Sequence, residues 1–251
     1  MTSDPAPAMP DPEEEVLDVL ARAPLEILGR IVTASNLTLL CRLDRDDQLA
    51  VYKPERGEAP LWDFPSRSLH RREVAAYILD RCEGGGMVPP TVLRTNGPFG
   101  PGSVQLFVDH DPDRHYFRLV TEPDPVTRAE LLRMVVFDLV ANNADRKGSH
   151  VLLDATGHLR LVDHGLCFNV APKLRTVAWD FADEPLPAEA RAFAVSAAER
   201  LDDSGDHVTR RLNELLDARE VSATAARARR VARLERFPRP SGRHPLPWPP
   251  L

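Results

Sequence analysis

The stretch that decides the fold runs Asn142-Asn143-Ala144-Asp145-Arg146-Lys147-Gly148-Ser149-His150 and leads directly into an apolar strand, Val151-Leu152-Leu153. A turn, Asp154-Ala155-Thr156-Gly157, follows, and the chain returns as His158-Leu159-Arg160-Leu161-Val162 before Asp163-His164-Gly165. An antiparallel hairpin about this turn places His150 close to Val162 and Asp163, with Asp145 one short loop away. Carboxylates gathered at one end of a hairpin repel each other unless a cation or a transferable proton compensates. The stretch therefore predicts a site built on Asp145 and Asp163.

The composition is that of an ordinary globular protein. Of the 251 residues, 43% are hydrophobic and 28% are charged, which suits one sizeable domain or two lobes that share a cleft. The net charge of -6 argues against nucleic-acid binding as the main task. No apolar run approaches the roughly 20 residues that span a bilayer, so no transmembrane segment is expected.

The cysteines and the N-terminal sequence predict a cytoplasmic protein. Cys41, Cys82 and Cys167 are scattered and odd in number, which is typical of free thiols in a reducing cytosol. Residues 1–15 are acidic and Pro-rich and lack the basic and apolar regions of a secretory signal. We expect them to form a disordered tail.

Strand-like segments come first along the chain and helical segments later, which predicts an α+β fold of two lobes. Strands are expected over 25–32, 37–43, 49–53 and 104–108, and helices over 68–81, 187–201, 206–218 and 221–237. A further helix is expected from Thr127, where Thr127 and Glu130 form a capping box before the apolar run 131–140.

These elements divide the chain into a β-rich N-lobe over 24–110 and a mostly helical C-lobe over 111–236. A Pro-rich tail over 237–251 follows, which can be neither helix nor central strand. It is either a polyproline-like tail or a docking peptide for a partner protein, because Trp248 and Leu251 are unusual residues to leave loose.

Lys53 is the first candidate outside the hairpin. Period-2 alternation puts it on the same strand face as Leu49 and Val51, and a lysine on an apolar face needs an anionic partner. Glu73 follows on the packing face of the next helix, and a strand lysine paired with a helix glutamate is a common way to fix a phosphate-binding lysine. The alternatives are a surface lysine with a solvated head and a solvated glutamate paired with Arg72.

Polar residues in two loops supply further candidates. Ser35 and Asn36, at the tip of the first hairpin, can offer hydroxyl and backbone N–H donors to phosphate, although an ordinary turn has the same composition. Asp145 is the candidate for orienting or deprotonating a hydroxyl, and Arg146, with Lys147, for stabilising negative charge on a transferred group.

Asp163 is the candidate metal ligand. Gly165 is expected to allow the abrupt change of direction that aims Asp163 at the metal. His150, across the hairpin, is a second metal ligand, a direct contact for phosphate, a sign of weakened activity or a structural histidine.

The order of these residues resembles the phosphatidylinositol 3-/4-kinase-like superfamily, an atypical branch of the protein-kinase fold that also contains HipA-type kinases. The resemblance covers about residues 24 to 236 and includes the segments Tyr52-Lys53-Pro54 and Asp163-His164-Gly165, which are also similar to a small bacterial family of kinase-like proteins. The superfamily's motifs are Asp-Arg-His-Asn-x-Asn and Asp-Phe-Gly. In this chain Lys147 stands for the first His, His150 for the last Asn and His164 for Phe.

The resemblance implies a role for each matching residue. Lys53 would contact the α-phosphate of ATP and Glu73 would hold it, with Asp145, Arg146 and Lys53 as the catalytic set. Asp163 and His150 would hold Mg²⁺ or Mn²⁺. The full nucleotide-binding set is Ser35, Asn36, Val51, Lys53, Glu73 and the adenine-binding hinge Gln105, Leu106, Phe107 and Val108.

The function implied is an ATP- and divalent-metal-dependent phosphotransferase that acts on a protein Ser/Thr or a small hydroxyl compound. Lys173 and Arg175, in the segment after Asp163, predict an anionic acceptor or a phosphate that activates this segment. The chain has no room for the helical and lipid-binding domains of lipid kinases, which disfavours a lipid acceptor. Two alternatives stay open. One is transfer of AMP. The other is a pseudokinase that binds nucleotide as a sensor or scaffold, with the Pro-rich tail and the helix 227–236 as partner surfaces.

Overall fold

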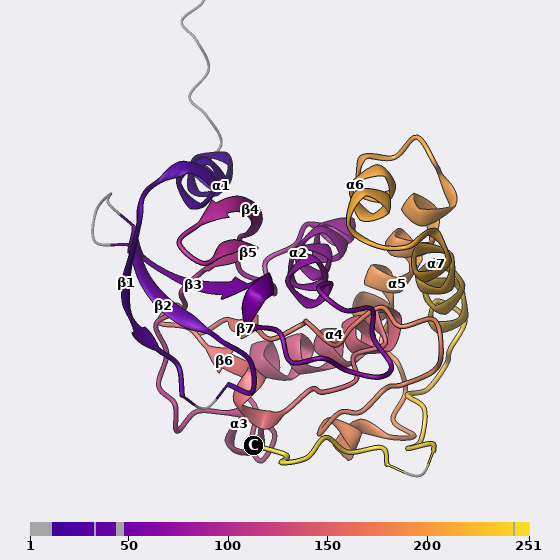
Figure 1. The fold of residues 1–251 in the computed structure, drawn as a ribbon. Coiled ribbons are helices and arrows are strands. Elements are labelled where there is room, and N and C mark those ends of the chain that lie inside the picture. Colours follow the sequence, from indigo (N-terminus) through magenta and orange to yellow (C-terminus); the bar gives the residue numbers. More distant parts are fainter. Residues whose placement is uncertain (1–11, 33, 44–47, 243) are drawn as a thin grey trace, which may run out of the picture.

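The computed structural model describes residues 12–32, 34–43, 48–242 and 244–251 (Figure 1). The α-helices are α1 Pro12–Arg22, α2 Leu69–Asp80, α3 Tyr116–Leu119, α4 Pro125–Ala141, α5 Ala188–Asp202, α6 His207–Leu215 and α7 Ala218–Val231. The strands are β1 Leu25–Arg30, β2 Leu39–Leu43, β3 Leu49–Pro54, β4 Thr91–Gly97, β5 Gly100–Leu106, β6 Val151–Leu153 and β7 Leu159–Leu161. The predicted α+β, two-lobed architecture is confirmed: the sheet of β1 to β5 lies on one side and helices α4 to α7 on the other.

The N-terminal sheet is antiparallel between all neighbours, in the order β1-β2-β3-β5-β4. Burial alternates along β3: Ala50 and Tyr52 are buried, whereas Val51 and Lys53 are partly exposed. Ala50 and Tyr52 pack with Leu20 of α1 in one apolar cluster, so α1 covers that face of the sheet. Lys53 therefore lies with Val51 on the opposite face, as period-2 alternation predicts.

The sequence pattern predicts neither α1 nor β4. The expectation of a disordered tail is wrong for residues 12–15, which form the first turn of α1, and residues 1–11 lie outside the described residues. The three consecutive glutamates at 13–15 make the start of α1 look like an acidic tail in the sequence, although the helix has an apolar stripe that contains Leu20. Arg94 of β4 donates to the carbonyl of Ala23 at 2.7 Å and so fixes the end of α1 to the sheet.

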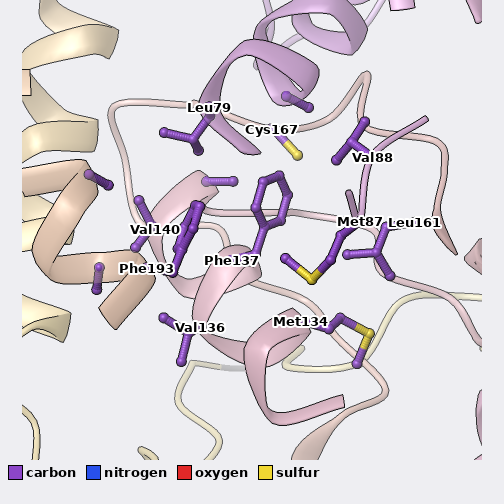
Figure 2. Packing of buried hydrophobic residues seen from close by; sticks show 14 of the residues in the cluster. Leu79, Met87, Val88, Met134, Val136, Phe137, Val140, Leu161, Cys167 and Phe193 are labelled. Atoms are coloured by element: carbon purple, nitrogen blue, oxygen red, sulfur yellow. The ribbon is translucent and has the colours of Figure 1, made fainter. Parts of the chain in front are cut away.

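Helix α4 is the buried centre of the second lobe. Its apolar side chains join α2, β7 and α5 into one large cluster (Figure 2), whose members include Leu79, Met134, Phe137, Leu161 and Phe193. Because α2 contributes to this cluster, the helix that carries Glu73 is held by the core of the second lobe as well as by the sheet.

The capping box expected at Thr127 and Glu130 is wrong. Helix α4 begins at Pro125, and Asp124 caps it by accepting the N–H groups of Val126 and Thr127 at 2.9 and 3.1 Å. Glu130 instead accepts the N–H of Leu159 at 2.7 Å, which pins the β6–β7 hairpin to α4. The helix expected over 221–237 is also shorter than predicted, because α7 ends at Val231.

The β6–β7 hairpin forms as predicted. Val151 pairs with Leu161, and the turn is closed by Asp154, whose carboxylate accepts the N–H groups of Thr156 and His158. Beyond β7, the N–H of Val162 donates to the carbonyl of His150 at 3.1 Å. This pairing brings the residue that follows, Asp163, beside His150.

The Pro-rich tail forms no helix or strand in its described residues, 237–242 and 244–251. It runs along the second lobe, and its end lies beside α3 (Figure 1). No helix in the described part of the chain combines the length and the apolarity required to cross a bilayer.

Candidate active site

Three charged residues that are distant in sequence meet in an ion cluster between the two lobes. The Nζ atom of Lys53 on β3 lies 2.5 Å from Oε1 of Glu73 on α2 and 2.9 Å from Oδ1 of Asp163 after β7. Burial alone would lower the pKa of Lys53, but the carboxylates of Asp163 and Glu73 outweigh it and raise that pKa. The lysine is therefore a fixed cation. Arg72 forms its ion pair with Glu220, at 2.6 Å, so the alternative pairing of Glu73 with Arg72 does not occur and Glu73 pairs with Lys53.

The backbone at Asp163 makes the change of direction that aims its carboxylate. Its φ of 61° is in the left-handed region, which aspartate tolerates better than most residues. The turn also presents the N–H of His164 to Oε2 of Glu73 at 2.9 Å. The expectation that Gly165 makes this turn is wrong: its φ is not positive, and a Cβ there would be in ordinary contact with Leu69 and Glu73, at 3.4 and 3.5 Å.

Asp145 lies in the loop after α4, which is braced as the two asparagines predict. Asn142 ends the helix in a left-handed conformation, and Oδ1 of Asn143 accepts the N–H of Asp145 at 3.0 Å. Oδ2 of Asp145 lies 3.6 Å from Nζ of Lys147. Burial, with the nearby charge of Asp163, raises the pKa of Asp145 to about 6, although Lys147 and Arg175 both act to lower it. The carboxyl group is thus able to exchange a proton near neutral pH.

Arg146 is a buried structural residue. Its side chain is fully buried, and its guanidinium donates two bonds of 2.9 Å to the two oxygens of Asp138 on α4. It also donates to the carbonyl of Val162 at 3.0 Å and lies 2.9 Å from Nε2 of His164. The expectation that Arg146 contacts the transferred group is wrong, since its donors hold the loop of Asp145 to the end of β7.

His150 lies beside Asp163. Its Nδ1 accepts the N–H of Lys147 at 3.4 Å, and its Nε2 lies 3.3 Å from Oδ2 of Asp163. Burial, assisted by Arg146 and other nearby cations, lowers the pKa of His150 to about 4, so the ring is neutral at pH 7. A neutral imidazole whose Nδ1 accepts must carry its proton on Nε2. This tautomer has no lone pair directed at a metal from Nε2, which disfavours His150 as a metal ligand.

The nucleotide-binding candidates on the sheet are divided between its two faces: Leu106 pairs with Ala50 and packs in the apolar cluster on the side of α1. Val51 and Gln105 are paired across β3 and β5 on the same face as Lys53, and the amide of Gln105 is buried and donates to Thr91 at 2.8 Å. The N–H of Phe107 donates to the carbonyl of Leu49 at 3.0 Å. Recognition of adenine by residues 105–108 stays a prediction, as does phosphate binding by Ser35 and Asn36.

Asn36 has a structural contact. Its Oδ1 accepts the N–H of Ala59 at 2.8 Å, which ties the loop after β1 to the segment that follows η1 Glu55–Gly57. Lys173, a candidate for binding the acceptor, is likewise engaged: Nζ lies 2.8 Å from Asp63 and 5.0 Å from the centre of the Trp62 ring. Arg175 is exposed beside Asp145 and is the better-placed cation for an acceptor.

Sequence reasoning misses one residue of this site, Asp138, which holds Arg146 and is 1% exposed. His164, for which the sequence favours a packing or hydrogen-bonding role, has that role: it is buried, and its Nε2 accepts from Arg146 at 2.9 Å. A lone acid inside the apolar run 131–140 was the available indication for Asp138, because a buried carboxylate requires a partner. The partners of His164 have no comparable sequence indication.

The fold and this cluster define a protein of the atypical protein-kinase class. The chain is similar to the crystal structure of the Golgi casein kinase, with a TM-score of 0.50 and 16% sequence identity over 88% of this chain and 75% of that chain. It also matches the Helicobacter pylori proinflammatory kinase CtkA, with a TM-score of 0.47 and 12% identity over 86% of this chain and 98% of that chain.

The sequence comparisons give the family. Residues 67–209, more than half of the chain, match the family model of phosphatidylinositol 3- and 4-kinases, and the chain belongs to that family. A protein of Mycobacterium tuberculosis, named Protein Rv2133c, is 37% identical over 264 residues, which cover 92% of this chain and 94% of that protein. Fold and family together support a phosphotransferase.

The donor set fits a divalent cation that arrives with a nucleotide. Within the described ranges, no group of three or more His, Cys, Asp or Glu side chains is arranged to hold a metal by itself. Mg²⁺ is usually held by one or two carboxylates together with substrate phosphates. The carboxylate of Asp163, 46% exposed and ending in hard oxygen atoms, suits that role.

Proposed function

We propose that this protein is an ATP- and divalent-metal-dependent phosphotransferase whose acceptor is a hydroxyl group of a protein Ser/Thr or of a small molecule. The observation that carries the proposal is the ion cluster of Lys53, Glu73 and Asp163, with Asp145 beside it. Four charged residues from separate parts of the chain are held together at a cost in desolvation, which a purely structural role would not require.

Each residue has a distinct task in this proposal. Lys53, oriented by Glu73, binds phosphate oxygens of the nucleotide, and Asp163 holds Mg²⁺ or Mn²⁺, which would neutralise charge on the phosphates. Asp145 orients the acceptor hydroxyl and accepts its proton at Oδ1 or Oδ2. Lys147 and Arg175 are the cations that flank Asp145.

The remaining site residues act by positioning. The ring of His150, whose Nε2 lies 3.3 Å from Oδ2 of Asp163, flanks the carboxylate from the hairpin side. Arg146 keeps the Asp145 loop fixed against β7. The buried free thiols Cys41, Cys82 and Cys167 fit the reducing compartment, the cytoplasm, that we propose for the protein.

The test is calorimetric titration with ATP in the presence of Mg²⁺, of Mn²⁺ or of EDTA, comparing the wild type with Asp163→Asn. We expect binding that depends on metal and weakens at least about tenfold in Asp163→Asn, which loses a charged ligand. Asp113→Asn, the same change at an exposed position, is the matched control and should bind like the wild type. Absence of binding by the folded wild type would refute the proposal.

The label on the product separates the reaction types. Incubation with ATP labelled at the γ-phosphate should label the acceptor, or inorganic phosphate when water is the acceptor. Transfer of label from the α-phosphate would indicate AMP transfer instead. Binding that needs no metal and persists in Asp163→Asn would favour the pseudokinase, for which the contact of His150 with Asp163 is the supporting observation.

A further inference from the structure

The described end of the tail is hydrogen-bonded to the loop that contains Asp145 and to the segment 175–179 beside it. We call residues 244–251 the C-terminal strap. The carbonyl of Pro245 accepts both the N–H of Thr176 and the indole N–H of Trp179, each at 3.0 Å. The carbonyl of Pro250 accepts the N–H of Gly148 at 2.8 Å. Between these anchors Pro247 is buried, so the strap, which runs along the second lobe (Figure 1), is held at three points, Pro245, Pro247 and Pro250.

Gly148 shows how closely the strap fits the loop of Asp145. This glycine lies three residues after Asp145 and opens the turn η3 Gly148–His150. A Cβ added to it would lie 2.8 Å from the ring of Phe117 in α3 and 3.3 Å from Cδ1 of Leu251. The loop, α3 and the end of the strap therefore pack together with no room for a side chain at residue 148.

The other anchor lies on the segment that runs beside the same loop. The N–H of Arg146 donates to the carbonyl of Arg175 at 3.0 Å, and the N–H of Val177 donates to the carbonyl of Arg146 at 3.1 Å. Thr176, between them, has its N–H turned away to Pro245. The strap thus completes the hydrogen bonding of this short ladder, which sets the position of Arg175 relative to Asp145.

We propose that the C-terminal strap is a positioning element of the active site, which holds the Asp145 loop and the segment 175–179 in register. Its described hydrogen bonds go to these two loops rather than to Lys53 or Asp163. Loss of the strap should therefore slow turnover without weakening nucleotide binding. The effect on turnover rests on the proposed function; the effect on loop order does not.

The experiment uses a protease site inserted between Pro240 and Ser241, both of which are exposed. The full chain is folded first, then cut, and the freed strap is removed by gel filtration. Amide exchange is measured at Gly148 and Thr176, together with ATP affinity and the turnover of ATP. We expect exchange at both amides to quicken at least about tenfold, as expected for the loss of two hydrogen bonds. Turnover should fall at least about tenfold while the Kd for ATP changes less than about threefold, since the described hydrogen bonds of the strap go to Gly148, Thr176 and Trp179.

A synthetic peptide of residues 241–251, added back, should restore slow exchange and turnover together. Trp179→Phe, which removes the indole donor to Pro245, should give a milder form of the same changes. Trp248→Phe is the matched control on the strap itself, because its indole is 88% exposed, and it should change nothing.

Unchanged exchange at Gly148 and Thr176 after removal of the strap would overturn the proposal. So would a change in exchange with turnover retained, or a loss of ATP affinity as large as the loss of turnover. If the intact protein binds and turns over no ATP, the proposed function fails and the holding of the two loops by the strap is judged on amide exchange and peptide rescue.

Discussion

Replacing Arg146 with methionine tests whether this residue holds the site together or contacts the reaction. Methionine keeps much of the side-chain volume and removes all the guanidinium donors. Those donors bond to the carboxylate of Asp138, the carbonyl of Val162 and Nε2 of His164. Asp138 and His164 are buried, and Val162 is half-buried. We therefore expect Arg146→Met to lower stability far more than it lowers nucleotide binding by the protein that remains folded.

The magnitude follows from what the substitution leaves behind. Asp138 is 1% exposed, and among the described residues its carboxylate would keep one hydrogen-bond partner, the amide of Asn143 at 3.0 Å. Removal of one member of a buried ion pair costs about 3 to 5 kcal/mol, which is a large part of the roughly 5 to 15 kcal/mol that holds a domain folded. For a chain of this length the expected fall in Tm is on the order of 6 to 20 °C.

The assay is thermal and urea denaturation, followed by ATP titration at a temperature where both proteins are folded. Arg71→Met, the same change at an exposed position of α2, is the control and should cost under about 0.5 kcal/mol. A double change, Arg146→Met with Asp138→Leu, should recover part of the loss because no buried charge is left unpaired. The reasoning is refuted if Arg146→Met is as stable as the wild type but turns over ATP at least about a hundredfold more slowly.

Three further outcomes follow from the same geometry. Turnover should fall about tenfold for each pH unit below about 6, because protonation of Asp145 removes the proton acceptor; a pH profile with no acid limb near that value would count against its role. Since the pKa of Asp145 is raised on folding, its ionisation destabilises the folded chain as pH rises from about 4 to 6, so Asp145→Asn should increase Tm at pH 7 while it lowers turnover. Gly165→Ala should cost under about 1 kcal/mol, whereas Gly102→Ala, whose Cβ would lie 2.5 Å from the carbonyl oxygen of Lys53, should cost several times more in urea denaturation.

Much of the frame follows from local pattern. The strand over β3, the hairpin of β6 and β7 and helix α2 each depend on alternation, turn chemistry or helical spacing within about a dozen residues. These elements carry Lys53, Glu73 and Asp163, and the resemblance of their order to that of the kinase superfamily predicts that they meet in one place. Helix α1 was missed because its acidic first turn conceals the apolar residues that pack on the sheet.

Arg146 and His150 show where sequence reasoning stops. From the sequence, an arginine next to Asp145 could equally donate to a bound phosphate or form a buried ion pair. Which of the two it does depends on Asp138, eight residues earlier on another element. For His150 the decisive contact is a backbone N–H, that of Lys147, which fixes the tautomer. Any residue at position 147 other than proline would offer that N–H, so the residue type there does not predict the tautomer of His150.

Asp145 and Asp163 are harder still to tell apart from the sequence, because their side chains are identical and their different roles depend on their surroundings. Although burial would raise the pKa of Asp163, the ammonium of Lys53 beside it holds that pKa well below its usual range. Asp145 has its pKa raised to about 6. Acids separated in this way suit separate roles, a permanent anion for a cation and a group that exchanges a proton. Removal of the Lys53 ammonium should therefore raise the pKa of Asp163. Both aspartates would then have raised pKa values, and neither would serve as the permanent anion that a metal ion requires.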